Sequence, residues 1–198
     1  MRHYVLAGVF LLAPAVPAAA QVGFFVRAGA TASSSLVDDH IVQAISVKPK
    51  VAPTVAGGVS YLIGPRYRAD VEVAVSSGDY TITTGGSQNT AGTLRTIAAT
   101  IGLEGPLSTR LGWRAGLGIL RYAPAQKDGI FLKGGTTRAL MSAGLDYRVP
   151  VGQKLGVVVS GRYDFHRFTT GQLELLGYTL AQDVHRASVS VGIDWRAP

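Results

Sequence analysis

The fold is indicated by a stretch near the C-terminus, residues 185–195, which reads HRASVSVGIDW. From Ala187 to Trp195, apolar side chains occupy every second position, and Ser, Gly and Asp stand between them. Successive side chains of a β-strand point to opposite faces of the sheet, so this alternation predicts a strand with one apolar and one polar face. An amphipathic helix would instead repeat its apolar positions every three or four residues.

The same alternation recurs along the chain and predicts an all-β protein. Eight segments show it, each bounded by residues that favour turns. They lie at 22–31, 54–63, 67–77, 93–104, 110–122, 136–149, 154–166 and 183–195. Short connections (64–66, 105–109, 150–153) alternate with long ones (32–53, 78–92, 123–135, 167–182). This alternation is typical of an eight-stranded antiparallel up-and-down transmembrane β-barrel with tight periplasmic turns and longer extracellular loops.

The aromatic residues indicate that the apolar face of these strands meets lipid. A soluble lipocalin-type barrel would instead turn its apolar face inward around a ligand. Here aromatic residues of the apolar face gather at both ends of the strands, as in the girdles at membrane interfaces. The predicted interface aromatics are Phe24, Tyr61, Tyr67, Trp113, Tyr147 and Trp195 at the end with short turns, and Tyr163 and Phe165 at the other end.

The first residues predict a secretory signal peptide. A short basic region precedes an apolar run from Val5 to Val16, and three alanines at 18–20 offer a cleavage site before Gln21. The apolar run is too short to span a bilayer, which needs about 20 residues. We therefore expect a signal peptide at 1–20 and an outer-membrane β-barrel domain at 21–198, located in the bacterial cell outer membrane.

The composition excludes several classes of protein. The chain has no cysteine, so a scaffold held together by disulfides is excluded. Its net charge of +7 would allow nucleic-acid binding. The charges, however, are scattered singly and follow an export signal, so we expect no nucleic-acid partner.

The first predicted strand resembles that of a known family. Residues 23–30, GFFVRAGA, are similar to the first strand of OmpW-type small outer-membrane proteins. Residues 113–122 and 142–148 are similar to stretches of the wider OmpA-type barrel group, and Ser190 to Ala197 resembles the terminal-strand signal read by the barrel-assembly machinery. The resemblance implies a small barrel with that machinery as a partner. For an OmpW-like protein it also implies a narrow conduit for small hydrophobic solutes.

The polar face carries charges of both signs in nearly equal number. Seven arginines and six carboxylates are expected to face the lumen: Arg27, Arg68, Arg114, Arg138, Arg148, Arg162 and Arg186, with Asp70, Glu72, Glu104, Asp146, Asp164 and Asp194. An unpaired buried charge is costly, so a balanced set predicts a closed network of ion pairs between neighbouring strands. The functional alternative, a selectivity filter, would show one dominant sign.

No residue pattern predicts a catalytic site, a metal site or a cofactor. Some outer-membrane barrels modify lipid A, and such hydrolysis needs a Ser, a His and a carboxylate near the outer leaflet. His166 lies beside Asp164 but has no serine two residues on, and both His166 and His185 are interpreted as solvated or interface residues. The cluster Asp38-Asp39-His40 lacks a returning ligand at suitable spacing, which favours a solvated turn over a metal site.

The expected function is therefore non-catalytic, either a structural role in the envelope or an interaction at the surface. The alternative is the OmpW-like conduit, and a lipid A-modifying enzyme is the least favoured reading. A conduit would need hydrophobic residues at the lumen mouth, where the sequence shows few, chiefly Leu62 and Val158. Apolar residues at 173–180 favour either adhesion or an extension of the last two strands. Outer-membrane lipid (lipopolysaccharide) is the expected partner, and the protein is expected to be a monomer.

Overall fold

Nearly all of the described chain is β-strand. The computed structural model describes residues 22–39, 45–84, 87–126, 129–132, 134–175 and 181–196, so the signal peptide expected at 1–20 lies outside the described residues. The strands are β1 (Val22–Ser33), β2 (Val37–Asp39), β3 (Ile45–Pro49), β4 (Ala52–Ile63), β5 (Tyr67–Thr84), β6 (Ser87–Pro106), β7 (Leu111–Pro124), β8 (Thr136–Pro150), β9 (Leu155–Phe168) and β10 (Gln182–Arg196). Two short helices lie in the connections, the 3-10 helix η1 (Gly129–Phe131) and α1 (Gly171–Leu175). Neither of these helices, nor any other within the described ranges, is long and apolar enough to cross a membrane.

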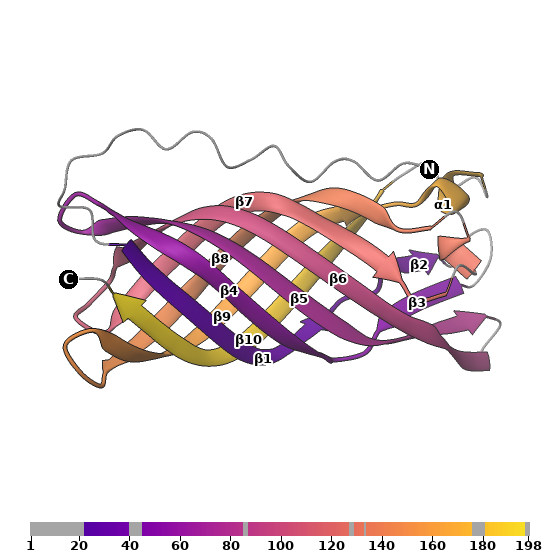
Figure 1. The fold of residues 1–198 in the computed structure, drawn as a ribbon. Coiled ribbons are helices and arrows are strands. Elements are labelled where there is room, and N and C mark those ends of the chain that lie inside the picture. The colour runs from indigo at the N-terminus through magenta and orange to yellow at the C-terminus, as the bar shows by residue number, and fades with distance from the viewer. Residues whose placement is uncertain are drawn as a thin grey trace, which may run out of the picture.

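Eight of the strands close into a ring. They pair antiparallel in the order β5-β4-β1-β10-β9-β8-β7-β6, and the pairing of β5 with β6 joins the two ends. Figure 1 shows the result as a long barrel with all of its strands tilted against the axis. This arrangement confirms the predicted eight-stranded up-and-down barrel. Every strand of the ring has a partner on both sides, so the ring itself presents no free edge.

The three predicted short turns lie at one end of the barrel, here called the short-turn end, and the opposite end is called the loop end. The chain enters and leaves the ring at the short-turn end, where Gly23 pairs with Arg196. Gly64 stands in the turn between β4 and β5 with a φ of 67°. Glycine tolerates this left-handed conformation because it has no Cβ, which lets the turn close in three residues.

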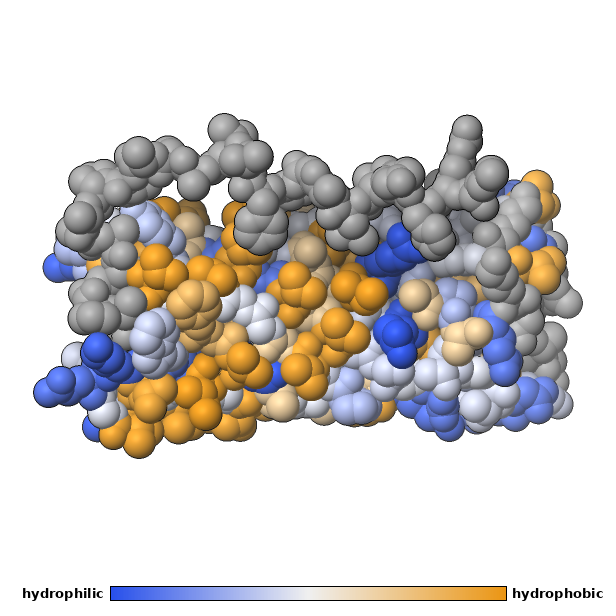
Figure 2. Space-filling model, viewed as in Figure 1, coloured by the Kyte–Doolittle hydropathy of each residue, from blue (hydrophilic) through white to orange (hydrophobic). Residues whose placement is uncertain are grey.

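The strand register places the apolar positions outside and the polar positions inside. Leu117 of β7 is 63% exposed, whereas Arg114, three residues earlier on the same strand, is only 7% exposed. Figure 2 shows apolar residues covering the short-turn half of the barrel and polar residues toward the loop end. An exposed apolar surface that covers half of the barrel is unfavourable in water and suits contact with lipid.

Two of the predicted long loops consist largely of strand. β5 and β6 continue as a paired hairpin to Thr84 and Ser87, so the prediction of a loop at 78–92 is wrong. A register irregularity between Tyr80 and Thr81 interrupts the alternation there, which explains why the pattern did not reveal the strands. Within the connection at 32–53, β3 pairs with β5 and β2 pairs with β3. Figure 1 shows β2, β3 and α1 at the loop end, and these elements, with η1 and the hairpin at 78–92, are called the loop crown.

A compact apolar core fills the interior at the loop end. It combines inward-facing residues from the strand ends with side chains of the loop crown. This loop-end core consists of Leu36, Val37, Val47, Tyr80, Leu94, Ala98, Leu120, Tyr122, Ile130, Phe131, Leu140, Phe168, Leu173 and Val184. The expectation of few hydrophobic residues at the lumen mouth is therefore wrong. Leu62, which was assigned to that mouth, lies instead beside the turn at 64–66, at the short-turn end.

Candidate functional site

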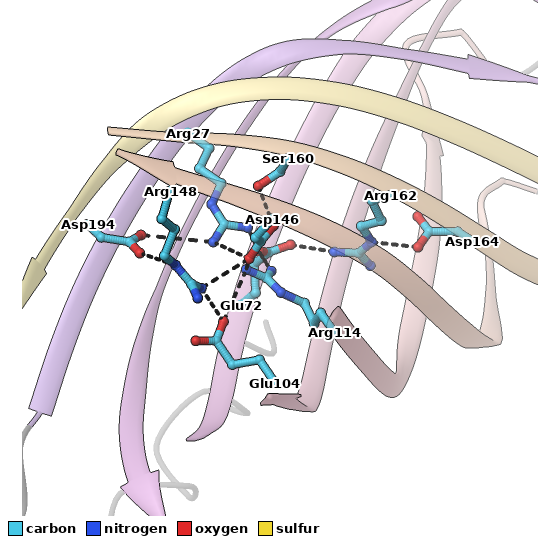
Figure 3. A network of polar contacts seen from close by, with 10 residues as sticks. All are labelled: Arg27, Glu72, Glu104, Arg114, Asp146, Arg148, Ser160, Arg162, Asp164 and Asp194. Carbon is cyan, nitrogen blue, oxygen red and sulfur yellow. Dashed lines mark hydrogen bonds and ion pairs between the residues drawn. The ribbon is translucent and has the colours of Figure 1, made fainter. Parts of the chain in front are cut away.

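The barrel interior holds a network of ion pairs, drawn in Figure 3, with Arg114 at its centre. Nη1 of Arg114 donates to Oε2 of Glu72 at 2.7 Å, and Nη2 donates to Oδ2 of Asp146 at 2.9 Å. Arg27 approaches the same two carboxylates from β1, on the opposite wall, at 3.6 Å from Glu72 and 3.3 Å from Asp146. All four side chains are less than 10% exposed, so these charges interact without much screening by water.

The network extends toward the short-turn end through Arg148 of β8. Its Nη2 donates to Oε2 of Glu104 at 2.6 Å, and its Nε donates to Oδ2 of Asp194 at 3.0 Å. The same guanidinium lies 3.2 Å from Asp146, which joins this group to the centre of the network.

Toward the loop end the network continues through Arg162 of β9. Its Nε donates to Oδ1 of Asp164 at 2.5 Å, and its Nη1 reaches across the lumen to Glu72. Ser160 of the same strand donates to Oδ1 of Asp146 at 2.6 Å. Glu72 therefore accepts from arginines on two different walls of the barrel.

Several of these partners are not on neighbouring strands, which differs from the expectation that each charge pairs with the strand beside it. Arg27 of β1 reaches Asp146 of β8, and Arg162 of β9 reaches Glu72 of β5. An arginine side chain is long enough to span an interior of this width, which eight strands make narrow. The pairs Arg27–Asp146 and Arg162–Glu72 therefore cross the lumen, and these cross-lumen ion pairs are called the charged braces.

An aromatic ring supports the centre of the network. Phe25 faces inward and is 5% exposed. The Cζ atoms of Arg27 and Arg114 lie 4.5 Å and 5.4 Å from its ring centroid, within the range of a cation–π interaction. Phe25 belongs to the stretch 23–30 that carries the family resemblance, but its inward position shows a role in the lumen and not at the lipid interface.

Four other charges predicted for the lumen also face inward. Arg68 lies 3.9 Å from Glu104, and Asp70 is buried with no hydrogen bond to its Oδ1. Arg138 donates from Nη2 to the backbone carbonyl of Thr169, just before α1, at 2.7 Å, and this hydrogen bond links β8 to the loop crown. Arg186 donates only to hydroxyl groups.

The loop-end core lies above the network and contains its own polar pair. The hydroxyl of Tyr122 and Nε2 of His166 are 2.6 Å apart and hydrogen-bonded, and both residues are almost completely buried. The interpretation of His166 as a solvated or interface residue is therefore wrong. Phe131 packs edge-on against Tyr80 at 5.8 Å and against Phe168 at 6.0 Å between ring centroids.

The last long connection turns back onto this core. Leu173 in α1 is buried, and its backbone N–H donates to Oγ1 of Thr170 at 3.2 Å. The Thr170 hydroxyl in turn donates to the carbonyl of Ile130 in η1 at 2.7 Å. Leu173 is therefore neither an exposed residue available for adhesion nor part of an extended strand. Leu175 is exposed, and residues 176–180 lie outside the described chain.

Two small cavities and one larger recess lie beside these side chains. A cavity of about 50 Å³ lies within the barrel beside the network, and another of about 20 Å³ lies beneath the loop-end core. A recess of about 420 Å³ opens at the short-turn end. The two inner cavities accommodate a few water-sized molecules at most.

The predicted interface aromatics lie on the outer face. At the short-turn end, Phe24, Tyr67, Tyr147 and Trp195 are exposed, and Tyr61 and Trp113 are half-buried. Phe24 and Trp195 pack together with their ring centroids 5.7 Å apart. Nearer the loop end, Phe165 is half-buried, and the exposed Tyr163 is hydrogen-bonded to Nδ1 of His185.

No metal centre is found within the described ranges, where His, Cys, Asp and Glu form no group of three or more that could hold an ion. Asp38 of β2 is exposed, and His40 lies outside the described residues. His166 has Nε2 occupied by Tyr122 and is buried beside the loop-end core, so it does not reach the lipid-facing surface.

The inward part of the loop-end core was missed in the sequence, although a signal for it exists. Leu120 and Tyr122 continue the same every-second-residue positions that Arg114, Gly116 and Gly118 occupy lower on β7. The polar face thus becomes apolar beyond the membrane-spanning part of the strand. When the inward face of a strand changes from polar to apolar while the two-residue alternation continues, the pattern predicts that apolar side chains close the lumen there.

No model of a protein family matches the chain, and no curated protein matches it. The chain is similar to Neisserial surface protein A (TM-score 0.57, 11% identity, covering 90% of this chain and 99% of that one). It is also similar to the attachment invasion locus protein Ail of Yersinia pestis, solved in complex with the heparin analogue sucrose octasulfate (TM-score 0.52, 9% identity, 90% and 99%).

A third similar structure is the outer membrane protein OprG of Pseudomonas aeruginosa (TM-score 0.52, 11% identity, covering 88% of this chain and 95% of that one). At such identities the similarity concerns the fold alone. The fold is that of the small outer-membrane β-barrels of bacteria, and the exposed apolar band is the surface that such barrels present to lipid.

Proposed function

We propose that this outer-membrane barrel is a non-catalytic, non-conducting protein that acts through its loop crown at the cell surface. The observation that carries the proposal is that the lumen is closed at two levels by different means. Charged braces cross it in the middle, and the loop-end core fills it above.

The charged level resists opening because its pairs are buried. A passage through the middle of the barrel would have to separate Glu72 from two arginines that donate to it. Leaving such a buried charge without its partner costs about 3–5 kcal/mol. Ions of either sign would meet a nearly neutral set of charges, which supports a structural network over a selectivity filter.

The apolar level argues against a conduit for small hydrophobic solutes. Such a conduit needs an open apolar passage, whereas Tyr122, Phe131 and Phe168 pack against one another across the mouth. These side chains are almost completely buried. A solute could pass only after the loop crown had separated from the strand ends.

The described part of the loop crown is held together by strand pairing and hydrogen bonds. The hairpin of β5 and β6 extends beyond the ring, and β3 covers part of the exposed edge of β5. Helices α1 and η1 are joined through Thr170 and Ile130, and both contribute side chains to the loop-end core. Ordered loops lose little entropy on binding a partner, which favours interaction.

Outer-leaflet lipid is the partner best supported for the rim below the crown. Arg95 of β6 and Arg121 of β7 are both exposed on the outer face, and the register makes them diagonal neighbours: Arg95 pairs with Ala123, and Arg121 pairs with Ile97. No carboxylate of the described residues lies within ion-pair distance of either arginine. Phosphate groups of lipopolysaccharide would supply the missing negative charge, since arginine forms strong bidentate bonds with phosphate.

Planar-bilayer recording of the purified barrel tests the closed lumen. We expect no steady current in concentrated KCl. The Leu132→Ala variant, altered at an exposed position of the same connection as Phe131, should behave like the wild type. A stable single-channel current from the wild-type protein would reject the closed lumen and support the conduit.

Complementation separates a surface role from a purely structural one. Cells that lack the protein receive either the full barrel or a barrel in which residues 78–92 are replaced by a tight turn. Because this hairpin lies beyond the ring, the trimmed barrel should still insert. If the trimmed barrel restores resistance to detergent as well as the full one does, the role is structural and the proposed surface role is wrong.

The lipid partner is tested by thermal unfolding in nanodiscs with and without lipopolysaccharide. Lipopolysaccharide should raise the melting temperature of the wild type and should do so less for the double variant Arg95→Gln/Arg121→Gln. Arg66→Gln, an exposed arginine in a short turn at the opposite end, is the matched control and should keep the full response. An equal response of all three proteins would exclude the arginine pair as a lipid site.

A further inference from the structure

Arg186 differs from the arginines of the ion-pair network in what surrounds it. It points into the lumen from β10 and is 6% exposed. Its Nη2 donates to Oγ of Ser76 at 3.3 Å and to Oγ1 of Thr96 at 3.1 Å. The other two nitrogens, Nε and Nη1, have no hydrogen-bond partner. Two buried donors of a cation are therefore left without an acceptor.

No carboxylate compensates this charge directly. Asp164 stands opposite Arg186 in the β9–β10 pairing, but its Oδ1 accepts from Arg162. Within the described residues, no carboxylate lies within 4.0 Å of the Arg186 guanidinium. Arginine cannot release its proton in a protein, so the charge persists and needs a counter-charge or water.

Space for such a group exists in two cavities that Arg186 lines. Arg186 lines the cavity of about 50 Å³ and also the cavity of about 20 Å³ beneath the loop-end core. One water-sized molecule needs about 10–15 Å³ measured in this way, so the larger cavity can hold a halide ion together with water.

The lining of these cavities supplies further donors. Ser76 and Thr96 bond to each other at 2.6 Å, which uses only one of their two hydroxyl hydrogens and leaves the other free to turn toward an anion. Ser188 and Ser190 of β10 line the larger cavity as well. The carboxylates of Glu72, Asp146 and Asp164 also line this cavity, and each is already paired with an arginine.

We propose that the cavities beside Arg186 hold one small monovalent anion of the size of a halide ion, bound by the free guanidinium nitrogens and neighbouring hydroxyls. The single uncompensated positive charge of Arg186 matches a monovalent anion. The site lies between the charged braces and the loop-end core, so the anion is a fixed component of the folded interior and does not depend on conduction.

Bromide provides the direct test, because it replaces chloride and scatters X-rays anomalously. Crystals of the full barrel grown in sodium bromide should show an anomalous peak at hydrogen-bond distance from Nε or Nη1 of Arg186. Density that carries no anomalous signal would identify water, and the proposal would then be wrong.

Thermal unfolding provides a second, independent measurement. At constant ionic strength, replacing gluconate by chloride should raise the melting temperature of the wild type in a saturable way, because a ligand that binds only the folded state stabilises it. Arg186→Met should lose this response. Arg138→Met is the matched control and should retain the response, because Arg138 donates to a backbone carbonyl near α1. If Arg186→Met does not fold, the wild-type titration still decides: a melting temperature that chloride does not change overturns the proposal.

Discussion

At the scale of single residues, Glu72 is expected to have a large effect on stability, because three arginines lie within ion-pair distance of its buried carboxylate. Replacing Glu72 by Ala leaves these cations without a shared partner in a poorly solvated place. We expect the free energy of unfolding to fall by about 3 kcal/mol. Urea titration of the barrel refolded into lipid vesicles measures this change.

A double-variant cycle shows whether the loss comes from the pairing itself. Arg162→Met removes one of the arginines that donate to Glu72. Residues in one network couple, so the double variant Glu72→Ala/Arg162→Met should lose less stability than the two single variants added together. Strict additivity would show that the two side chains do not depend on each other.

Two glycines test how tightly neighbouring strands approach. A Cβ at Gly118 of β7 would lie 2.1 Å from the carbonyl oxygen of Ala99, whereas a Cβ at Gly161 of β9 would meet nothing within 4 Å. Gly118→Ala should therefore destabilise the barrel by about 1–3 kcal/mol, and Gly161→Ala should change its stability by less than about 0.5 kcal/mol. Equal urea midpoints for both variants would contradict the close approach at Gly118.

Which residues face the lumen could be predicted from the sequence, but not which of them meet. The two-residue period of each strand places Arg114 and Asp146 in the lumen, and this placement does not depend on how the other strands are arranged. The partner of Arg162 depends instead on the tilt and stagger of all eight strands, which bring Glu72 of a distant strand to its level. No local pattern records that stagger.

At the scale of whole strands, the outer face should tolerate charge according to depth. Leu117 lies in the middle of the outward positions of β7 and is well exposed, while Arg121 lies four residues nearer the loop end. Leu117→Arg should cost roughly 2–4 kcal/mol in a bilayer, because a charge at mid-depth meets hydrocarbon. Refolding titrations in vesicles should show a much smaller change for Arg121→Leu. Similar costs for the two variants would mean that the apolar band is placed at the wrong height.

The ends of the strands were harder to predict than their middles. Within the bilayer, lipid requires an apolar outer face, and this requirement imposes the alternation seen in β7 and β10. Beyond the bilayer both faces of a strand contact water or protein, so the strands of the hairpin at 78–92 carry no regular apolar alternation, and the sequence predicts a loop there. The strands stay paired there because backbone hydrogen bonds do not depend on those side chains.

The molecule as a whole should resist denaturation until the ring opens. A closed ladder has no edge strand at which unfolding can begin, so dodecyl sulfate at room temperature should leave the barrel intact. Unboiled and boiled samples should therefore migrate differently on a denaturing gel. Identical mobility of the two samples would argue against a closed ring in solution.

The loop-end core also implies an order of events in time. It contains both Leu36, near the start of the described chain, and Val184, near its end. Contacts between residues so far apart form slowly, and here they require that the intervening strands have already paired. The loop crown must therefore assemble last, after the ring has inserted, and until that moment its apolar side chains are open to the external medium. A newly inserted barrel should pass through a short period in which surface proteases can cut it, and the end of that period marks the completion of folding.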